Sequence, residues 1–156
     1  MAKTSARKRE AVTESRPLDM GDMDETLGFR LRLAQNVVFR EFSDRFGAME
    51  LTQSLYAILI LIQLNPGSRQ MELGAALGIR QTNLVERIDT LVGRGLVLRA
   101  PDPADRRANT LHLTDAGEAF MKEVRAVHDE MTQDFLNRLG ARDHAALVEL
   151  LKKLTV

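Results

Sequence analysis

The sequence predicts a mainly helical protein of the α+β class, with about six helices and a small two-stranded β unit. Apolar residues recur at three- and four-residue spacing through most of the 156-residue chain, as on the buried face of a helix. Hydrophobic residues make up 44% of the chain but aromatic ones only 4%, which disfavours a β-sandwich. Between Leu73 and Gly117, a helix–glycine–helix pattern passes directly into two short apolar runs around a loop rich in proline and aspartate. Together these patterns predict a winged helix-turn-helix.

Length and composition restrict the function further. The chain has the length of about one domain and can bury a hydrophobic core without a structural metal or disulfides. It contains no cysteine, which excludes disulfides, thiolate metal sites and thiol redox sensing. The apolar run from Leu55 to Leu64 is shorter than the ~20 residues of a membrane span, and the basic start has no apolar core behind it. We therefore expect a cytoplasmic protein with no membrane association.

The first part of the chain is expected to hold a polar arm and two helices. Residues 1–23 are polar and aperiodic, which is typical of a mobile arm; a disordered tail and a basic arm that touches DNA both remain open interpretations. Helical spacing predicts a first helix from Asp24 with a stop at Gly47. A second helix follows its expected N-cap Thr52 and ends at Pro66-Gly67.

The remaining elements are predicted from caps, glycines and alternation. Ser68 and Thr114 are the expected N-caps of a short third helix and a long fifth helix, and Gly140 is the expected end of the fifth. In chain order, we expect helices over 68–77 and 80–92, strands over 96–98 and 110–113, and helices over 114–140 and from 143 onward.

The third and fourth predicted helices have the chemistry of a DNA-reading pair. Small residues at 74 and 75 allow two helices to approach closely, and Gly78 allows the turn a positive φ. The second helix of the pair then presents side chains that bind base edges or phosphates. The alternative is a helical hairpin with a solvated polar face. The candidate contacts in this region are Arg69, Arg80, Gln81, Thr82, Asn83 and Arg87.

The loop between the predicted strands supplies a second candidate contact. Arg106 and Arg107 stand at its tip, where arginine is attracted to the minor groove or to phosphates. Asp105 is expected to orient Arg107 by a charge-assisted hydrogen bond. The net charge of zero argues against nucleic acid, but residues 66–113 hold seven arginines against five acids. Charge alone therefore leaves DNA binding undecided.

The chain resembles the MarR-type winged-helix transcriptional regulators over about residues 27–155. The residues that carry the resemblance are Leu77-Gly78-Ile79, Gln81-Thr82, Gly95-Leu96-Val97, Asp102-Pro103, Asp105-Arg106-Arg107, Leu111 and Leu113-Thr114-Asp115-Ala116-Gly117. The resemblance implies a homodimer, a DNA-reading fourth helix, a wing tip at Arg106 and Arg107, and release from DNA by a small, often aromatic or phenolic, anion. The chain departs from the redox-sensing branch of this family because it has no cysteine.

Apolar stripes at both ends of the chain independently favour a homodimer, because a monomer of this length has little core left to cover them. The candidate dimer contacts are Leu27, Leu31, Leu147, Leu150, Leu151 and Leu154. The predicted division is a mobile arm over 1–23, a dimerisation region over 24–50 and 118–156, and a DNA-binding region over 51–117.

Candidate effector contacts are a cation and rings near the first, second and fifth predicted helices. An arginine can pair with a carboxylate while rings pack an aromatic ligand, although the same rings also fit helical core spacing. These candidates are Phe39, Arg40, Phe42, Met49 and Tyr56. The histidines His112, His128 and His144 lack metal-ligand spacing, and no nucleophile–base pair or phosphate loop stands out, so we expect no metal, cofactor or enzyme activity.

The sequence thus predicts a ligand-responsive DNA-binding regulator. The partners expected are double-stranded operator DNA, a second copy of the chain and a small organic effector, either an aromatic or phenolic acid or its coenzyme A thioester. The alternative is a winged-helix protein-interaction module that binds no specific DNA and docks partners on its apolar last helix.

Overall fold

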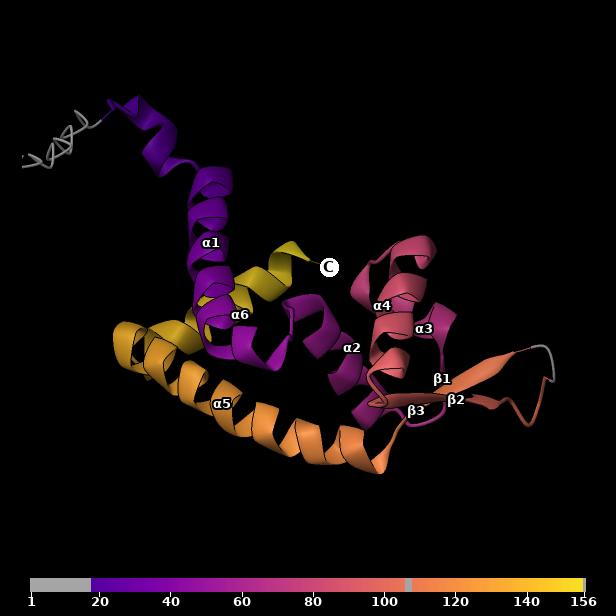
Figure 1. Cartoon of the computed structure of the whole chain (residues 1–156). Helices are drawn as coiled ribbons and strands as arrows, with labels where there is room; N and C mark the ends of the chain where they lie inside the picture. The colour runs from indigo at the N-terminus through magenta and orange to yellow at the C-terminus, as the bar shows by residue number, and fades with distance from the viewer. Residues whose placement is uncertain (1–17, 106–107, 156) are drawn as a thin grey trace, which may run out of the picture. The chain divides into compact units, whose positions relative to one another are not determined.

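The computed structural model describes residues 18–105 and 108–155, which form two compact units divided between Gln35 and Asn36 (Figure 1). The division falls within the first long helix, α1 (Leu27–Phe46). The other helical elements are η1 (Gly21–Glu25), η2 (Gly47–Met49), α2 (Gln53–Leu64), α3 (Gln70–Leu77), α4 (Gln81–Gly93), α5 (Asp115–Leu139) and α6 (Ala141–Leu154). Six α-helices are therefore present in the described residues, as predicted.

The first unit contains η1 and the beginning of α1. Arg30 donates from its guanidinium to the carboxylate and the backbone carbonyl of Asp24, so a local ion pair joins the two helices. The predicted polar arm therefore contains a 3₁₀ turn where it approaches α1. The remainder of that arm, residues 1–17, lies outside the described residues.

The second unit is built around α2, the most apolar helix. Ile58, Leu59 and Ile62 of α2 are fully buried and pack in one core with residues of α3, α4, α5 and the sheet. The predicted caps are confirmed: Thr52 accepts from the Leu55 N–H, and Thr114 accepts from the Gly117 N–H. These caps fix where α2 and α5 begin.

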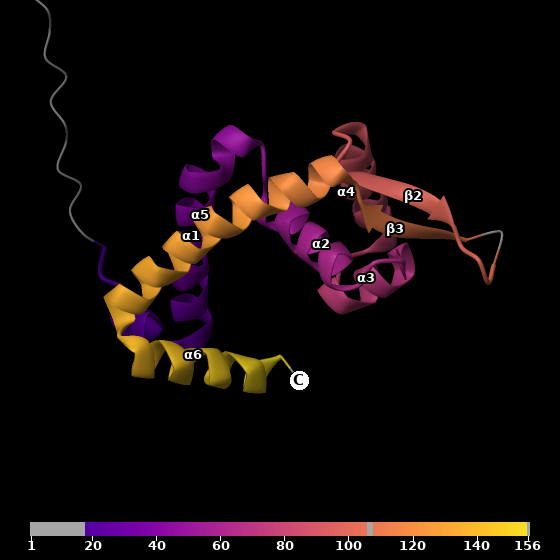
Figure 2. The ribbon, with the colours of Figure 1, turned by 90° about the horizontal axis from the view of Figure 1, so that it is seen from below.

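The sheet has three strands rather than the two expected. β2 (Val97–Pro101) and β3 (Asn109–Leu113) form the predicted antiparallel hairpin, with Leu98 opposite His112. β1 (Ser68–Arg69) pairs with the other edge of β3, which places β3 in the centre. Both ribbon views show the hairpin running out beyond α3 and α4 (Figures 1 and 2).

Two predicted helix boundaries are wrong, for different reasons. Ser68 does not cap α3, because it belongs to β1 and Arg69 is the N-cap residue instead. The Glu72 carboxylate accepts from the Arg69 backbone N–H at 2.7 Å and so satisfies one helix donor. The last helix begins at Ala141, two residues before Asp143, because Gly140 with a φ of 80° turns the chain directly from α5 into α6.

No single helix within the described residues is long and apolar enough to cross a membrane. The segments Leu27–Met49 and Gln53–Leu64 meet that criterion only jointly, across a bend of 74°.

Candidate nucleic-acid interface and pocket

One face of α4 is buried and its N-terminal turn is exposed. Leu84, Ile88 and Leu91 are fully buried, so the helix is held firmly against the core. Arg80, at the N-cap, and the following side chains Thr82 and Asn83 are exposed. This arrangement leaves polar donors and acceptors at the beginning of a fixed helix, where major-groove readers carry their base contacts.

The helix pair has the close contact that its glycines predicted. Gly78 adopts a φ of 62° and ends α3, as expected for the turn. Gly74 is buried, and a Cβ added there would lie 2.5 Å from the Gln81 side chain and 3.3 Å from Leu84. α3 therefore supports the exposed turn of α4 from directly behind.

Two of the predicted base-reading residues are engaged within the protein. The Gln81 amide oxygen accepts from Gln70 of α3 at 3.4 Å. Arg87 is half-buried and donates to the Asn83 carbonyl at 2.8 Å. Val85, which is not among the predicted contacts, is 39% exposed on the same helix. The freely presented polar side chains of this turn are thus Arg80, Thr82 and Asn83.

An ion pair anchors the beginning of the loop that connects β2 to β3. Arg69 donates from Nε and Nη2 to Oδ2 of Asp102, each at 2.6 Å. The other oxygen, Oδ1, accepts from the Ala104 N–H at 2.7 Å, and the Asp102 side chain is only 8% exposed. These backbone and guanidinium donors hold the pKa of Asp102 below its ordinary value of 3.8. Arg69 therefore has a structural partner as well as its predicted place near DNA.

The tip of the hairpin is only partly described. Asp105 is exposed, and its carbonyl accepts from the Ala108 N–H at 2.9 Å. Arg106 and Arg107, the predicted wing-tip contacts, lie outside the described residues.

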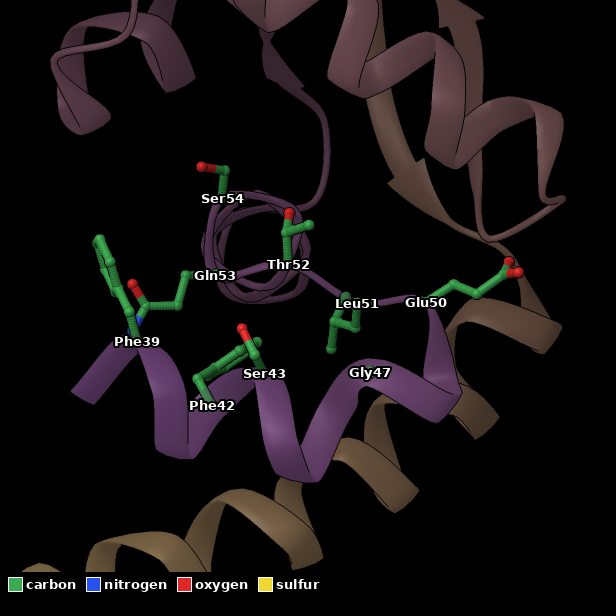
Figure 3. Close-up of a pocket in the computed structure, with 9 residues that line it drawn as sticks. All are labelled: Phe39, Phe42, Ser43, Gly47, Glu50, Leu51, Thr52, Gln53 and Ser54. Carbon is green, nitrogen blue, oxygen red and sulfur yellow. The ribbon is translucent and has the colours of Figure 1, made fainter. Parts of the chain in front are cut away.

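A pocket of about 510 Å³ lies between the C-terminal part of α1 and the start of α2 (Figure 3). Phe39, Phe42 and Ser43 come from α1, and Thr52, Gln53 and Ser54 come from the first turn of α2. Gly47, Glu50 and Leu51 complete the lining from the intervening turn. Its walls thus combine aromatic surface with hydroxyl and amide groups, the usual mixture in a small-molecule site.

Only two of the five predicted effector contacts line this pocket, namely Phe39 and Phe42. Arg40 is exposed and does not line it, so no arginine or lysine is found among the nine residues of this described pocket. Met49 and Tyr56 pack against the core instead. The predicted arginine–carboxylate pairing is therefore not provided by this pocket within the described chain.

Tyr56 belongs to an aromatic cluster that joins three helices. Its ring stacks on His128 of α5 with centroids 4.9 Å apart and lies 5.8 Å from Phe42 of α1. Burial raises the pKa of Tyr56 and lowers that of His128. His128 is therefore a packing residue, and the described residues contain no cluster of histidine and acidic side chains that could hold a metal ion.

The turn between α1 and α2 is held by Arg94, a residue that is not among the predicted contacts. Glu50 has a φ of 51°, the left-handed conformation that usually costs a non-glycine residue about 1–2 kcal/mol. The carbonyls of Met49 and Glu50 each accept from Arg94, at 2.9 Å. A non-glycine residue at positive φ leaves no signature in a single sequence, so this contact was not predictable.

Comparisons with known proteins show the family of the chain. The model of the MarR family matches residues 51–108, which include α2, α3, α4 and the beginning of the wing. A candidate transcriptional regulatory protein for the hcr operon of Thauera aromatica is 33% identical over 149 residues, which cover 95% of this chain and 90% of the relative.

Solved structures extend the similarity to the fold. The repressor CouR bound to a 23-mer DNA duplex is 36% identical, with a TM-score of 0.84, and the match covers 90% of this chain and all of CouR. CouR bound to p-coumaroyl-CoA is 33% identical, with a TM-score of 0.81, over 89% of this chain and 98% of that structure. The chain belongs to the MarR family of winged-helix transcriptional regulators. That membership places it among DNA-binding regulators and not among enzymes.

Proposed function

We propose that the protein is a homodimeric repressor that binds operator DNA through α4 and the wing and leaves it when a small organic effector binds. The exposed polar turn of α4, backed by three fully buried side chains, is the observation that carries DNA binding. The similarity to CouR in its DNA-bound form supports the same assignment.

The proposed contacts fall into two groups. Arg80, Thr82 and Asn83 enter the major groove, with Gln81 and Arg87 at the edge of the contact. The second group grips phosphates or the minor groove and consists of Arg69 of β1 with Arg106 and Arg107 of the hairpin loop, where Asp105 orients Arg107.

The homodimer is proposed because α6 carries uncovered apolar side chains. Leu147, Leu150 and Leu154 are 44%, 58% and 55% exposed, and Leu27 at the beginning of α1 is 60% exposed. With Leu31 and Leu151 they form the proposed dimer contacts, in the dimerisation region 24–50 and 118–156. A two-fold dimer presents two reading helices about 34 Å apart, which requires a pseudo-palindromic operator.

The effector is proposed to be an aromatic or phenolic acid or its coenzyme A thioester. The two phenylalanines of the α1–α2 pocket can pack an aromatic ring, and the Ser43 and Thr52 hydroxyls can bind its polar substituent. The p-coumaroyl-CoA complex of CouR supports this class. If the effector is a free acid, the positive charge that pairs with its carboxylate must come from residues outside the described pocket lining. In a thioester the carboxylate is replaced by the thioester bond, so the aromatic part needs no such pairing.

A gel-shift titration against the DNA upstream of the protein's own gene tests the proposal. Specific binding should survive excess competitor DNA and weaken when p-coumaroyl-CoA or a free aromatic acid is added. Each compound that releases the DNA should also raise the melting temperature of the free protein, because it binds the folded state. Binding that competitor DNA abolishes would contradict the repressor assignment.

A further inference from the structure

We propose that Arg94 is a positioning residue that couples the α1–α2 pocket to α4, so that the occupant of the pocket changes DNA affinity through this side chain. The inference rests on the proposed function and concerns how the two sites communicate.

At one end, Arg94 is attached directly to the DNA-reading helix. It is the C-cap residue of α4, and its backbone N–H donates to the Thr90 carbonyl. The helix in front of it is rigidly packed, since Leu84, Ile88 and Leu91 are fully buried. The Arg94 side chain is therefore anchored at the end of a helix whose position is fixed by its buried face.

At the other end, the guanidinium holds the turn that forms one wall of the pocket. Nη1 donates to the Glu50 carbonyl and Nη2 to the Met49 carbonyl, both at 2.9 Å. Glu50 and the next residue, Leu51, line the pocket. A ligand that shifts this wall must therefore move or break the two hydrogen bonds.

The turn is also suited to having two arrangements. Glu50 is the one non-glycine residue at positive φ in the described chain, and its N–H donates back to the Gly47 carbonyl at 3.0 Å. Strain of this kind persists where surrounding contacts hold it and is released when they are lost. Arg94 supplies two of the holding contacts.

An arginine is required because the contact is bidentate and its position is fixed from a third side. The planar guanidinium presents two donors in a fixed geometry to two successive carbonyls, whereas the donors of a lysine ammonium rotate freely about its flexible stem. It also lies over the Phe120 ring of α5, 5.3 Å from the centroid. Directional hydrogen bonds transmit orientation, whereas the apolar packing between α2 and α4 is non-directional.

Reciprocity provides a test that needs no known effector. If the pocket turn and α4 are coupled, binding of DNA must change the turn as much as the turn changes DNA affinity. The probe is the duplex from upstream of the protein's own gene, and the readout is amide hydrogen exchange at residues 47–52. The Glu50 amide donates to the Gly47 carbonyl of η2 and the Leu51 amide to the Phe46 carbonyl of α1, so their protection reports the state of the turn.

We expect DNA to slow exchange of this turn by about fivefold or more in the native protein. In Arg94→Met the duplex should still bind, but the exchange rate of the turn should no longer respond to it; Arg94→Lys should respond weakly. Arg99→Met is the matched control, because it removes the ion pair between Arg99 and Asp89 of α4 without touching the pocket turn.

If DNA slowed amide exchange at residues 47–52 equally in the native protein and in both Arg94 variants, the coupling would be overturned and the repressor assignment would stand. The coupling would also be overturned, with the same assignment intact, if bound DNA left exchange at these residues unchanged in the native protein. Absence of specific duplex binding by the native protein would overturn the proposed function itself, and the coupling with it. Should Arg94→Met not fold, Arg94→Lys provides the comparison.

Discussion

At Gly117 the beginning of α5 passes so close to the chain before β2 that no side chain fits. A Cβ there would lie 2.1 Å from the Leu96 carbonyl oxygen, a backbone atom that cannot move without displacing the wing. Gly74 is different, because its nearest neighbour would be the far end of the flexible Gln81 side chain. An added Cβ would therefore clash with backbone at Gly117 but chiefly with a movable side chain at Gly74.

We expect Gly117→Ala to lower the free energy of unfolding by more than about 2 kcal/mol, since the backbone must shift. Gly74→Ala should change it by less than about 1 kcal/mol, because Gln81 can move and alanine favours the helix. Chemical denaturation of the two variants measures both values. Equal effects would contradict the backbone-clash explanation.

His128 makes stability depend on pH. Its pKa is lowered by burial, with Asp129 raising it and Arg125 lowering it further, while Tyr56 covers the ring. The unfolded chain thus binds the proton first as pH falls through the ordinary value of 6.5, so stability decreases in that range until the folded state is protonated too.

Melting temperature measured from about pH 7.5 to pH 5.5 should therefore fall more in the native protein than in His128→Gln. His144→Gln, in α6, serves as the control for adding a glutamine elsewhere. A native protein whose melting temperature rises on acidification relative to His128→Gln would show that the sign is wrong.

On helix α4, the side chains that hold the fold differ from those proposed to contact DNA. Asn83 is exposed, whereas its neighbour Leu84 is fully buried. Asn83→Ala should weaken binding to the specific duplex by about tenfold or more, with little change in non-specific binding, because a base contact is worth about 1–3 kcal/mol. The melting temperature should not fall, since alanine is the better helix former.

Thr90→Ala is the matched control on the same helix. Thr90 is exposed two turns further along, and its hydroxyl donates to the Glu86 carbonyl of the same helix. Fluorescence anisotropy with the specific and a scrambled duplex measures both variants. If Thr90→Ala lost as much specific affinity as Asn83→Ala, the N-terminal turn would not be the reading surface.

The helices were predictable from the sequence because their apolar faces and caps are local signals. Thr52, Gly78 and Thr114 perform the roles their residue types predict. The two-residue strand β1 was not predictable, because it depends on pairing between Ser68 and Leu111, 43 positions apart. Ser68 has the residue type of a good N-cap, and tertiary pairing overrode that local preference.

The candidate site divided in the same way. The exposed turn of α4 follows from helical periodicity, so the exposure of Arg80, Thr82 and Asn83 was predictable, while their contact with DNA stays a prediction. The pocket depends on how α1 and α2 meet at Glu50, and only Phe39 and Phe42 of its lining were named from the sequence. Arg40 was a candidate because an arginine can pair with a carboxylate. It is exposed and does not line the pocket, although its neighbour Phe39 on α1 does.

At the scale of the molecule, the proposed dimer can be tested on α6. Leu150→Asp places a charge on its exposed apolar face, so we expect the variant to dissociate and to bind the specific duplex at least ~100-fold more weakly, because a single half-site remains. Lys153→Gln, an exposed change on the same helix, should leave the dimer intact. Light scattering gives the mass of each; a Leu150→Asp variant that remains dimeric would contradict the α6 interface.

The most direct test of the DNA-binding repressor assignment is the salt dependence of affinity for the upstream duplex. The chain has no net charge, so steep dependence must come from a localised contact with phosphates. Between 50 and 200 mM salt we predict a fall in affinity of about 10³-fold or more, with a specific duplex preferred over a scrambled one throughout. Weak binding that is insensitive to salt and equal for both duplexes would contradict the assignment and favour a protein-interaction module.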